Sequence, residues 1–256
     1  MTYTGIFDTH AHYDDECFDE DRFELLDEML ASNVSGIINC GCTVESSKTS
    51  IAFAEEYPQM YAAVGIHPQN AAEESEDALE KIEELAKHEK VVAIGEIGLD
   101  YHYDYTPKEM QIEYFEKQIL LAKKLNLPVI VHDREAHQDC VETLLKYKPR
   151  GVMHCFSGSV ETAKQLTDIG FYIGLGGSVT FKNAKKPAEV AASIDLDRLL
   201  LETDCPYMTP VPFRGIRNNS SLIIHTAEKI AELRGIKAQE VIDKARENAY
   251  KLFNIK

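Results

Sequence analysis

Short apolar segments alternate along the chain with longer segments of helical periodicity. The apolar segments span residues 5–7, 36–39, 61–66, 91–94, 128–131, 151–153, 171–175 and 199–201. They are nearly continuous in hydrophobicity, which is typical of parallel strands covered on both faces. Between them, apolar side chains recur at i, i+3 and i+4, as in residues 79–86 and again in residues 241–253. This spacing predicts amphipathic helices between the strands.

Local signals mark where several helices begin and end. Thr106 is a candidate N-cap, with Pro107 at the first helical position and Glu109 three residues after the cap. Gly170 and Gly235 directly follow helical segments, where a left-handed C-terminal residue favours glycine. The acidic run at residues 73–77 predicts a solvated helix start, because negative charge is favourable at that end of the helix dipole.

Eight strand–helix units in 256 residues predict a single (β/α)8 barrel domain spanning residues 1–256. The alternative is an open doubly wound sheet, which usually carries a glycine-rich phosphate turn after its first strand. Here the first strand continues into Asp8-Thr9-His10-Ala11-His12, which contains no glycine. The sequence therefore favours the barrel and disfavours a dinucleotide site.

Charge and cysteine content narrow the functional class. The chain has 27 basic and 43 acidic side chains, a net charge of −16, which argues against a broad cationic surface for duplex nucleic acid. A nucleic-acid enzyme with a small local anion site remains compatible with this balance. No apolar run reaches the roughly 18 to 20 residues of a membrane span, and no signal peptide is evident. Six scattered cysteines without a C-x-x-C pair predict free thiols in the cytoplasm.

Metal-ligating residue types follow five of the predicted strands. They are His10 and His12 after the first strand, Glu96 after the fourth, His132 after the fifth, His154 after the sixth, and Glu202 and Asp204 after the eighth. Barrel enzymes build their active sites at the carboxyl ends of the strands. A single H-x-H is only a moderate metal signal, but so many imidazoles and carboxylates crowded together require a cation between them. For His10 and Asp204 to share that site, the first strand must neighbour the eighth, as in a closed barrel.

The size of this set predicts two ions. Even without Glu202, the four histidines, Glu96 and Asp204 are more than one tetrahedral ion needs. They suit a pair of divalent ions about 3.5–4 Å apart with one bridging carboxylate, which lowers the pKa of a shared water toward about 7. Imidazole-rich ligation favours Zn, Mn, Co or Ni, and the carboxylates leave Mg open.

Six motifs in order resemble those of the TatD family of metal-dependent deoxyribonucleases, within the amidohydrolase superfamily. The motifs are Asp8-Thr9-His10-Ala11-His12, Gly65-Ile66-His67-Pro68, Gly95-Glu96-Ile97-Gly98-Leu99-Asp100, Val131-His132-Asp133-Arg134, His154-Cys155-Phe156-Ser157-Gly158 and Leu201-Glu202-Thr203-Asp204-Cys205-Pro206. One departure follows the eighth strand, where the family commonly has Arg-Asn-x-Pro and this chain has Arg217-Asn218-Asn219-Ser220.

The resemblance implies a role for each ligand. His10 and His12 would hold the first ion with Glu96 and Asp204, and Glu96 would bridge to a second ion held by His132 and His154. Asp204 would also orient or deprotonate the attacking water, so Glu96 and Asp204 are the implied catalytic residues. The implied reaction is hydrolysis of DNA phosphodiester bonds, including 3′–5′ exonuclease action on short or single-stranded ends.

Four further residues are candidate substrate-binding groups. Arg134 follows the fifth strand, and Arg214 and Arg217 lie after the eighth. A guanidinium there either binds a phosphate bidentately or anchors its loop through an ion pair. His67, after the third strand, either contacts substrate, ligates a third ion or forms hydrogen bonds around the centre. In the loop at residues 101–103, two tyrosines and a histidine either stack on a base or pack the loop.

Two other functions remain open from the sequence. The same metals could serve amide or ester hydrolysis, such as removal of an aminoacyl group from tRNA, because fold alone does not choose the bond. The absence of an evident strand-end lysine for carboxylation, with Glu96 in the bridging place, favours the phosphodiesterase. A non-catalytic metal-binding scaffold is the third option, and the full ligand set argues against it. The sequence indicates neither an obligate protein partner nor a membrane partner.

Overall fold

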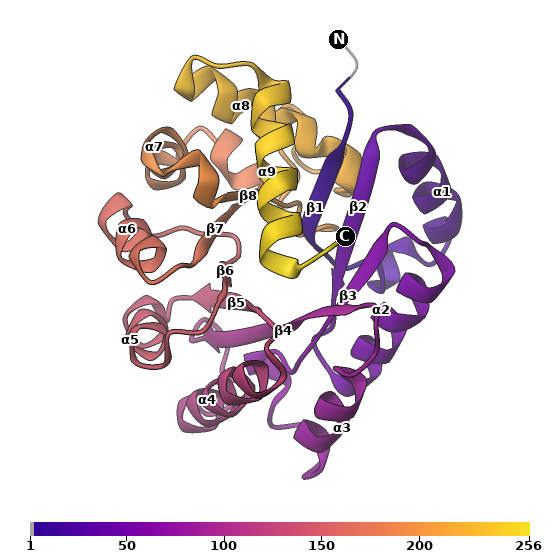
Figure 1. The fold of residues 1–256 in the computed structure, drawn as a ribbon, viewed down its shortest axis with the longest axis vertical. Coiled ribbons are helices and arrows are strands. Elements are labelled where there is room, and N and C mark those ends of the chain that lie inside the picture. Colours follow the sequence, from indigo (N-terminus) through magenta and orange to yellow (C-terminus); the bar gives the residue numbers. More distant parts are fainter. Residues whose placement is uncertain (1–2) are drawn as a thin grey trace.

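The computed structural model describes residues 3–256, whose strands form one parallel sheet with the strands in sequence order (Figure 1). The strands are β1 (Ile6–Ala11), β2 (Val34–Cys40), β3 (Met60–Val64), β4 (Val91–Asp100), β5 (Val129–Arg134), β6 (Gly151–Met153), β7 (Tyr172–Leu175) and β8 (Leu199–Leu201). Helices alternate with the strands and cover the outside of the sheet. This arrangement confirms the predicted (β/α)8 barrel.

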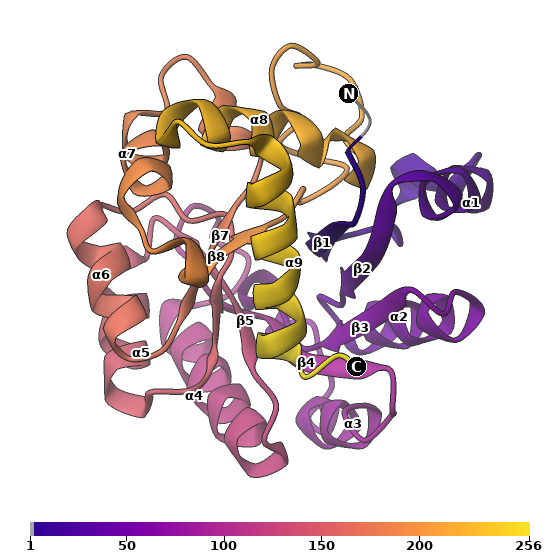
Figure 2. The same cartoon turned by 45° about the horizontal axis from the view of Figure 1, so that its top comes forward.

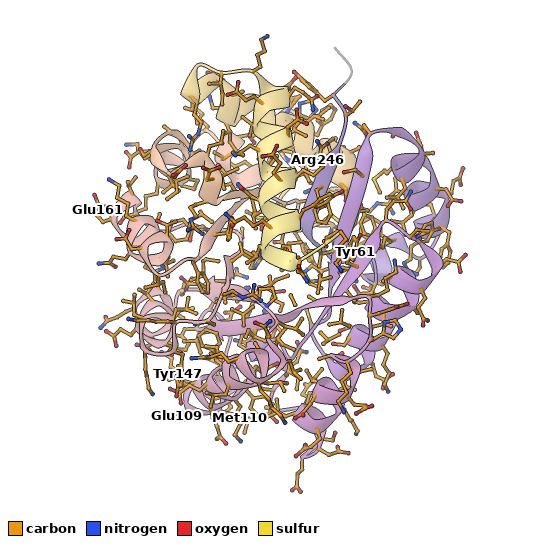
Figure 3. All side chains as sticks on the ribbon, in the orientation of Figure 1. Tyr61, Glu109, Met110, Tyr147, Glu161 and Arg246 are labelled. Atoms are coloured by element: carbon orange, nitrogen blue, oxygen red, sulfur yellow. The ribbon has the colours of Figure 1, made fainter. Side chains whose placement is uncertain are left out.

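The helices are α1 (Arg22–Ser32), α2 (Val44–Glu56), α3 (Ala78–Leu85), α4 (Lys108–Leu125), α5 (His137–Tyr147), α6 (Val160–Asp168), α7 (Lys185–Ser193), α8 (Ile223–Arg234) and α9 (Ala238–Phe253). The last of them, α9, lies across one end of the barrel (Figures 1 and 2). From α9, Arg246 reaches the start of β1, and its Nη1 donates a hydrogen bond to the Gly5 carbonyl oxygen at 3.2 Å (Figure 3).

The barrel closes between β1 and β8 at the carboxyl ends of these strands. Ala11 and Cys205 form a parallel bridge. The backbone N–H of His12 donates to the Cys205 carbonyl at 2.9 Å, and the N–H of Asp204 donates to the His10 carbonyl at 2.9 Å. The first strand therefore neighbours the eighth, as a shared site for His10 and Asp204 requires.

Buried apolar side chains form two clusters that alternate along the strands. Ile37 belongs to the cluster between the sheet and its helices, whereas the next residue, Ile38, belongs to the cluster within the barrel. The second cluster also contains Leu252 and Phe253 of α9, and Tyr250 of the same helix packs edge-on against Phe7 of β1, with ring centroids 5.5 Å apart. The amino end of the barrel is thus filled and covered, and the carboxyl end is left for a site.

Three strands extend at least three residues further than the apolar pattern predicts, and the first of them is β1, which reaches Ala11. β4 continues to Asp100 and β5 to Arg134, so Glu96 and His132 lie inside strands. Polar side chains there do not interrupt the backbone pairing, since Gly98 pairs with His132. Gly98 has a φ of +143°, and a Cβ at this position would lie 2.0 Å from the His132 carbonyl oxygen. Only glycine allows β4 and β5 to approach so closely here.

Helix termini agree with the sequence in part. Gly235 ends α8 with a φ of 67°, as predicted, and Gly170 has a φ of +96° just after α6. The predicted N-cap at Thr106 is wrong, because α4 begins at Lys108 with Pro107 as its cap residue. Thr106 is instead buried, and its hydroxyl donates to the Gln69 carbonyl at 3.0 Å. The helix α3 begins directly after the acidic run, at Ala78.

No helix within residues 3–256 combines the length and the apolar character needed to cross a bilayer.

Candidate metal centre

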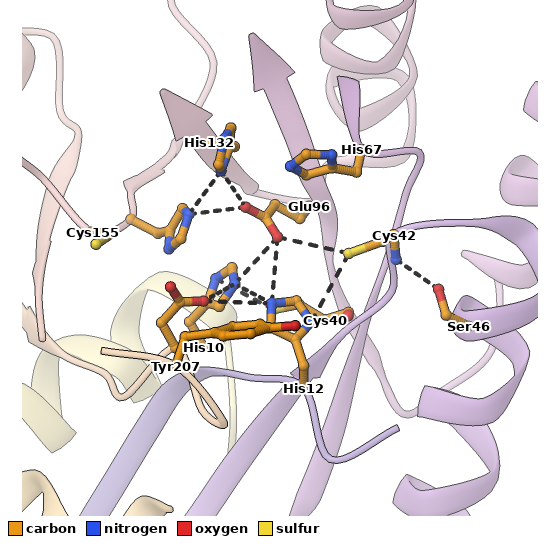
Figure 4. A network of polar contacts seen from close by, with 12 residues as sticks. His10, His12, Cys40, Cys42, Ser46, His67, Glu96, His132, Cys155 and Tyr207 are labelled. Carbon is orange, nitrogen blue, oxygen red and sulfur yellow. Dashed lines mark hydrogen bonds and ion pairs between the residues drawn. The ribbon is translucent and has the colours of Figure 1, made fainter. Parts of the chain in front are cut away.

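Six side chains from five strands or strand ends meet at the carboxyl end of the barrel (Figure 4). They are His10, His12, Glu96, His132, His154 and Asp204. Within the described residues, overlapping groups of three present ligand atoms that lie within 4.8 Å of one another. The six residues predicted from the sequence as metal ligands are therefore brought together in space.

Glu96 lies between the two pairs of histidines. Its Oε2 is 3.4 Å from His10 Nε2 and 3.5 Å from His12 Nε2. Its Oε1 is 2.8 Å from His132 Nδ1 and 2.9 Å from His154 Nε2. Each carboxylate oxygen thus faces a different pair of imidazoles, which is the arrangement that a bridging carboxylate requires.

Asp204 completes the side of the cluster that contains His10 and His12. Its Oδ1 is 3.7 Å from His10 Nε2 and 3.6 Å from His12 Nε2. Its side chain is 19% exposed, whereas those of His10 and Glu96 are 0% and 4% exposed. Asp204 is therefore the carboxylate of the cluster that is most accessible to a water molecule or a substrate.

The second ring nitrogen of several histidines has a partner behind the cluster. His12 Nδ1 lies 3.0 Å from the carbonyl oxygen of Cys40. His132 Nε2 lies 3.2 Å from Asp100 Oδ2. Such contacts fix the tautomer of a ligating imidazole, because the nitrogen that donates to the oxygen leaves the other one with its lone pair free. In their neutral forms, His12 and His132 would therefore present lone pairs toward Glu96.

The charges in the cluster depend strongly on one another. Burial alone would raise the pKa of Glu96, but the nearby His154 and His10 hold it well below its usual range. Burial, together with the neighbouring His154, lowers the pKa of His10 to about 4. For His132, hydrogen bonds to Asp100 and Glu96 outweigh burial and raise the pKa to about 9. Near neutral pH the metal-free cluster therefore combines an ionised Glu96, a protonated His132 and a neutral His10.

The donor set fits divalent metal ions. His10 Nε2 lies 2.9 Å from His12 Nε2, and His132 Nδ1 lies 3.3 Å from His154 Nε2. Ligand atoms of a tetrahedral ion with bonds near 2.0–2.1 Å lie about 3.3 Å apart. Converging nitrogen lone pairs beside buried carboxylates are costly unless a cation lies between them. The residues therefore have both the chemistry and the spacing of a metal centre.

The cluster lines a cavity of about 1100 Å³ that opens at the carboxyl end of the barrel. Two of the four candidate substrate-binding residues, His67 and Arg134, line this cavity as well. The His67 ring packs edge-on against His132, with the ring centroids 4.5 Å apart. Burial and the neighbouring His132 lower the pKa of His67 to about 3, so its imidazole is neutral.

The other two arginines lie outside the lining of the cavity. Arg217 makes a bidentate ion pair with Asp21, with Nη1–Oδ1 and Nη2–Oδ2 distances of 2.8 and 2.5 Å. This is the loop-anchoring one of the two arrangements expected for Arg217. The Arg214 guanidinium lies over the Phe181 ring, 4.0 Å from its centroid. A phosphate contact by Arg214 stays a prediction.

Three residues near the cluster are not among the six predicted metal ligands. Asp100 is 2% exposed and contacts His132, as described above. Glu202 is 1% exposed, and burial raises its pKa to about 8. Its Oε1 lies 3.8 Å from His154 Nδ1, and its Oε2 has no hydrogen-bond partner within residues 3–256. Cys42 lies with its Sγ 3.8 Å from Glu96 Oε2. Their positions in the sequence could have indicated a place beside the metal centre, because each residue lies at or just after the end of a strand.

The fold and the site together define a metal-dependent hydrolase built on a barrel. The family model for TatD related DNase matches residues 7–254, and the chain belongs to this family. A Bacillus subtilis protein named as the uncharacterized metal-dependent hydrolase YabD is 48% identical over 254 residues, covering 98% of this chain and 99% of that protein.

Two further relatives are informative. The 3′-5′ ssDNA/RNA exonuclease TatD of Erwinia tasmaniensis is 31% identical over 259 residues, covering 98% of this chain and all of that protein. The crystal structure of the TatD homologue YjjV from Escherichia coli superposes with a TM-score of 0.91 at 35% identity, covering 98% of each chain. The family suggested by the sequence motifs is thereby confirmed.

Proposed function

We propose that this protein hydrolyses phosphodiester bonds of DNA as a 3′–5′ exonuclease acting on short or single-stranded ends in the cytoplasm. His10, His12, Glu96 and Asp204 would hold one divalent ion, and Glu96, His132 and His154 would hold the second. Mg, Mn, Zn, Co and Ni are the candidate ions. When bound, such a pair lowers the pKa of water and stabilises charge on the attacking and leaving oxygens.

The residues of the chain would perform the remaining steps. His10, His12 and His154 lower the pKa of Asp204 despite its burial, so the carboxylate is ionised and able to accept a proton. In the proposed reaction, a water oxygen attacks phosphorus and passes a proton to Asp204. The bond between phosphorus and the 3′ oxygen then breaks, that oxygen takes up a proton from solvent, and Asp204 releases its proton to solvent. Arg134, on the cavity wall, would bind a phosphate oxygen.

The observation that carries the proposal is the position of Glu96, with one oxygen toward each pair of histidines. A bridged pair of ions suits the in-line displacement of phosphoryl chemistry, since it can stabilise both the entering and the leaving oxygen. The exonuclease named for the Erwinia tasmaniensis relative supports the same bond and the same direction of cleavage.

The test is digestion of a 5′-labelled single-stranded oligonucleotide by the metal-loaded protein in Mg²⁺ or Mn²⁺. We expect a ladder that shortens from the 3′ end, is abolished by a chelator and returns when the ion is restored. Glu96→Gln should lower kcat by more than about 100-fold, because loss of a mere supporting partner of a metal ligand already costs 10- to 100-fold. The matched control is Glu89→Gln, since Glu89 is exposed and precedes β4 at the opposite end of the barrel.

Parallel assays on an aminoacyl ester and an amide distinguish the reaction classes. Hydrolysis of the aminoacyl ester without cleavage of any oligonucleotide would assign the centre to ester chemistry instead. Full activity of Glu96→Gln would contradict the bridging role. Normal metal content with no turnover on any of these substrates would favour a non-catalytic scaffold.

A further inference from the structure

Three tyrosines with exposed rings stand at the edge of the cavity that contains the metal centre. We call them the aromatic rim: Tyr103 and Tyr105, which follow β4, and Tyr207, which follows β8. They are 40%, 69% and 56% exposed, respectively. Single exposed aromatic residues are ordinary on a protein surface, but several around one functional opening indicate a binding surface.

Ring stacking and hydrogen bonds hold the aromatic rim in place. The Tyr103 and Tyr105 rings stack with an interplanar angle of 8° and centroids 5.4 Å apart. Gln69 fixes their loop, since its Nε2 donates to the Tyr103 carbonyl at 2.9 Å and its Oε1 accepts from the Tyr105 N–H at 3.2 Å. The Tyr207 hydroxyl donates to Asp15 Oδ2 at 2.8 Å. Tyr105 and Tyr207 thus present the most ring surface to solvent, whereas the Tyr103 ring supports Tyr105 and contacts the Arg134 guanidinium. The rim has little freedom to lose on binding.

The neighbouring residues of the same loop differ from the rim. The Tyr101 hydroxyl donates to Asp139 Oδ2 at 2.7 Å, and the Lys108 ammonium lies 4.1 Å from the centroid of its ring. His102 pairs with Glu135 through Nδ1 at 2.7 Å. Tyr101 and His102 therefore pack the loop, and Tyr105 is the most exposed tyrosine of this loop.

The charge of the cavity makes phosphate contacts alone a poor means of holding a strand. Within the described chain, the carboxylates that line it are Asp14, Asp15, Glu73, Glu96, Asp100, Asp133 and Asp204. Among the residues of the described chain that line the cavity, Arg134 is the one arginine or lysine. Its guanidinium lies 4.9 Å from the centroid of the Tyr103 ring. Binding through neutralised phosphates needs several cationic side chains. Away from the two ions, a substrate strand must therefore gain much of its affinity from another source.

We propose that the aromatic rim stacks the bases next to the scissile phosphodiester of a single-stranded nucleic acid. This inference rests on the proposed nuclease function. Every base has a face for stacking, so the rim would bind strands with little regard to sequence. Bases inside a duplex already stack on their neighbours, so the rim selects single-stranded ends. Because few phosphates are neutralised, the affinity depends only weakly on salt.

The absence of tryptophan from the chain allows a direct binding assay. Tyr103→Trp keeps an aromatic face and provides a single fluorescent reporter in the rim. The metal-loaded variant is titrated with a phosphorothioate oligothymidylate that resists cleavage, and we expect saturable quenching. Tyr147→Trp is the matched control, because Tyr147 ends α5 at the opposite end of the barrel (Figure 3). Its fluorescence should not change.

Alanine variants measure the contribution of the rim to turnover. Tyr103→Ala, Tyr105→Ala and Tyr207→Ala should each raise KM for a single-stranded oligonucleotide by about 5- to 150-fold, the range expected for loss of one base–aromatic stack. Each should leave kcat/KM for methyl p-nitrophenyl phosphate within about twofold, since this small phosphodiester reaches only the metal centre. The corresponding phenylalanine variants should retain the wild-type KM, because they keep the ring face.

The outcomes separate this inference from the proposed function. Cleavage with an unchanged KM in all three alanine variants would overturn the inference and leave the nuclease function standing. Absence of quenching in Tyr103→Trp during active cleavage by that variant would overturn it as well. Quenching together with a complete lack of cleavage of any nucleic acid would support the rim as a binding surface and overturn the nuclease function.

Discussion

Asp8 offers a quantitative test of how the barrel is closed beside the metal centre. Its carboxylate is fully buried and accepts four hydrogen bonds. Two come from hydroxyls, Thr203 Oγ1 at 2.6 Å and Ser220 Oγ at 2.7 Å. Two come from backbone N–H groups, those of Thr203 at 3.0 Å and His10 at 3.2 Å. The side chain thus joins β1 to the segment after β8, where the strands share little backbone pairing.

The charge on Asp8 reduces stability at neutral pH. Burial raises its pKa from 3.8 to about 6, although the Thr203 and Ser220 hydroxyls oppose the shift. Protonated Asp8 therefore favours the fold below about pH 3.8, and this contribution is lost as pH rises through about 6. A shift of about two pKa units corresponds to about 3 kcal/mol. Asp8→Asn has no carboxyl group to titrate at this position. The free energy of unfolding of the variant minus that of wild type should therefore increase by about 3 kcal/mol as pH rises from below about 3.8 to above about 6.

Replacement of Asp8 by alanine should lower the stability of the folded protein. Asp8→Ala leaves the buried N–H groups of His10 and Thr203 without an acceptor, at about 1–3 kcal/mol each. It should therefore be less stable than Asp8→Asn at every pH. The assay is urea unfolding of metal-free wild type and both variants, followed by circular dichroism from about pH 4 to about pH 7. A stability difference between Asp8→Asn and wild type that stays constant over this range would refute the reasoning.

Three further predictions concern the site. Asp100→Ala should weaken metal binding by 10- to 100-fold in calorimetric titration, since Asp100 orients His132, and Asp100→Asn should weaken it less. In the metal-free protein the pKa of His132 is raised to about 9. Protonation of His132 therefore stabilises the metal-free fold fully below about pH 6.5, and this stabilisation is lost as pH rises through about 9. Metal binding should accordingly release a proton at neutral pH and strengthen toward pH 9, as titrations in buffers of different ionisation enthalpy would reveal. Arg217→Ala should leave KM for an oligonucleotide within about twofold, because the Arg217 side chain pairs with Asp21 and anchors a loop. The loss of this half-exposed pair should lower the free energy of unfolding by less than about 1 kcal/mol. Arg134→Ala, in contrast, should raise KM for the same oligonucleotide.

The sequence was sufficient to predict the architecture because the apolar pattern repeats eight times and each repeat is one strand–helix unit. It was less informative about where strands end. At Glu96 and His132 the side chains are polar but the backbone pairing continues, so hydropathy placed the ends of β4 and β5 too early. The N-cap of α4 was missed for a related reason. Thr106 has the residue type of a cap, but its hydroxyl is engaged by Gln69 from a distant segment.

The candidate metal ligands could be selected from the sequence because each follows a strand, and carboxyl ends of parallel strands meet at one rim. The residues around them could not be assigned in this way. Whether Arg217 contacts substrate or anchors a loop depends on Asp21, which lies 196 residues away in the chain. The role of Asp100 depends on the rotation of the His132 ring, which only packing determines.

The central claim is that Glu96 bridges two cations. Anomalous diffraction from crystals of the Mn²⁺-loaded protein tests it most directly. We expect two peaks about 3.5–4 Å apart, one beside each carboxylate oxygen of Glu96. A single peak bound by only one pair of histidines, or peaks remote from Glu96, would contradict the account.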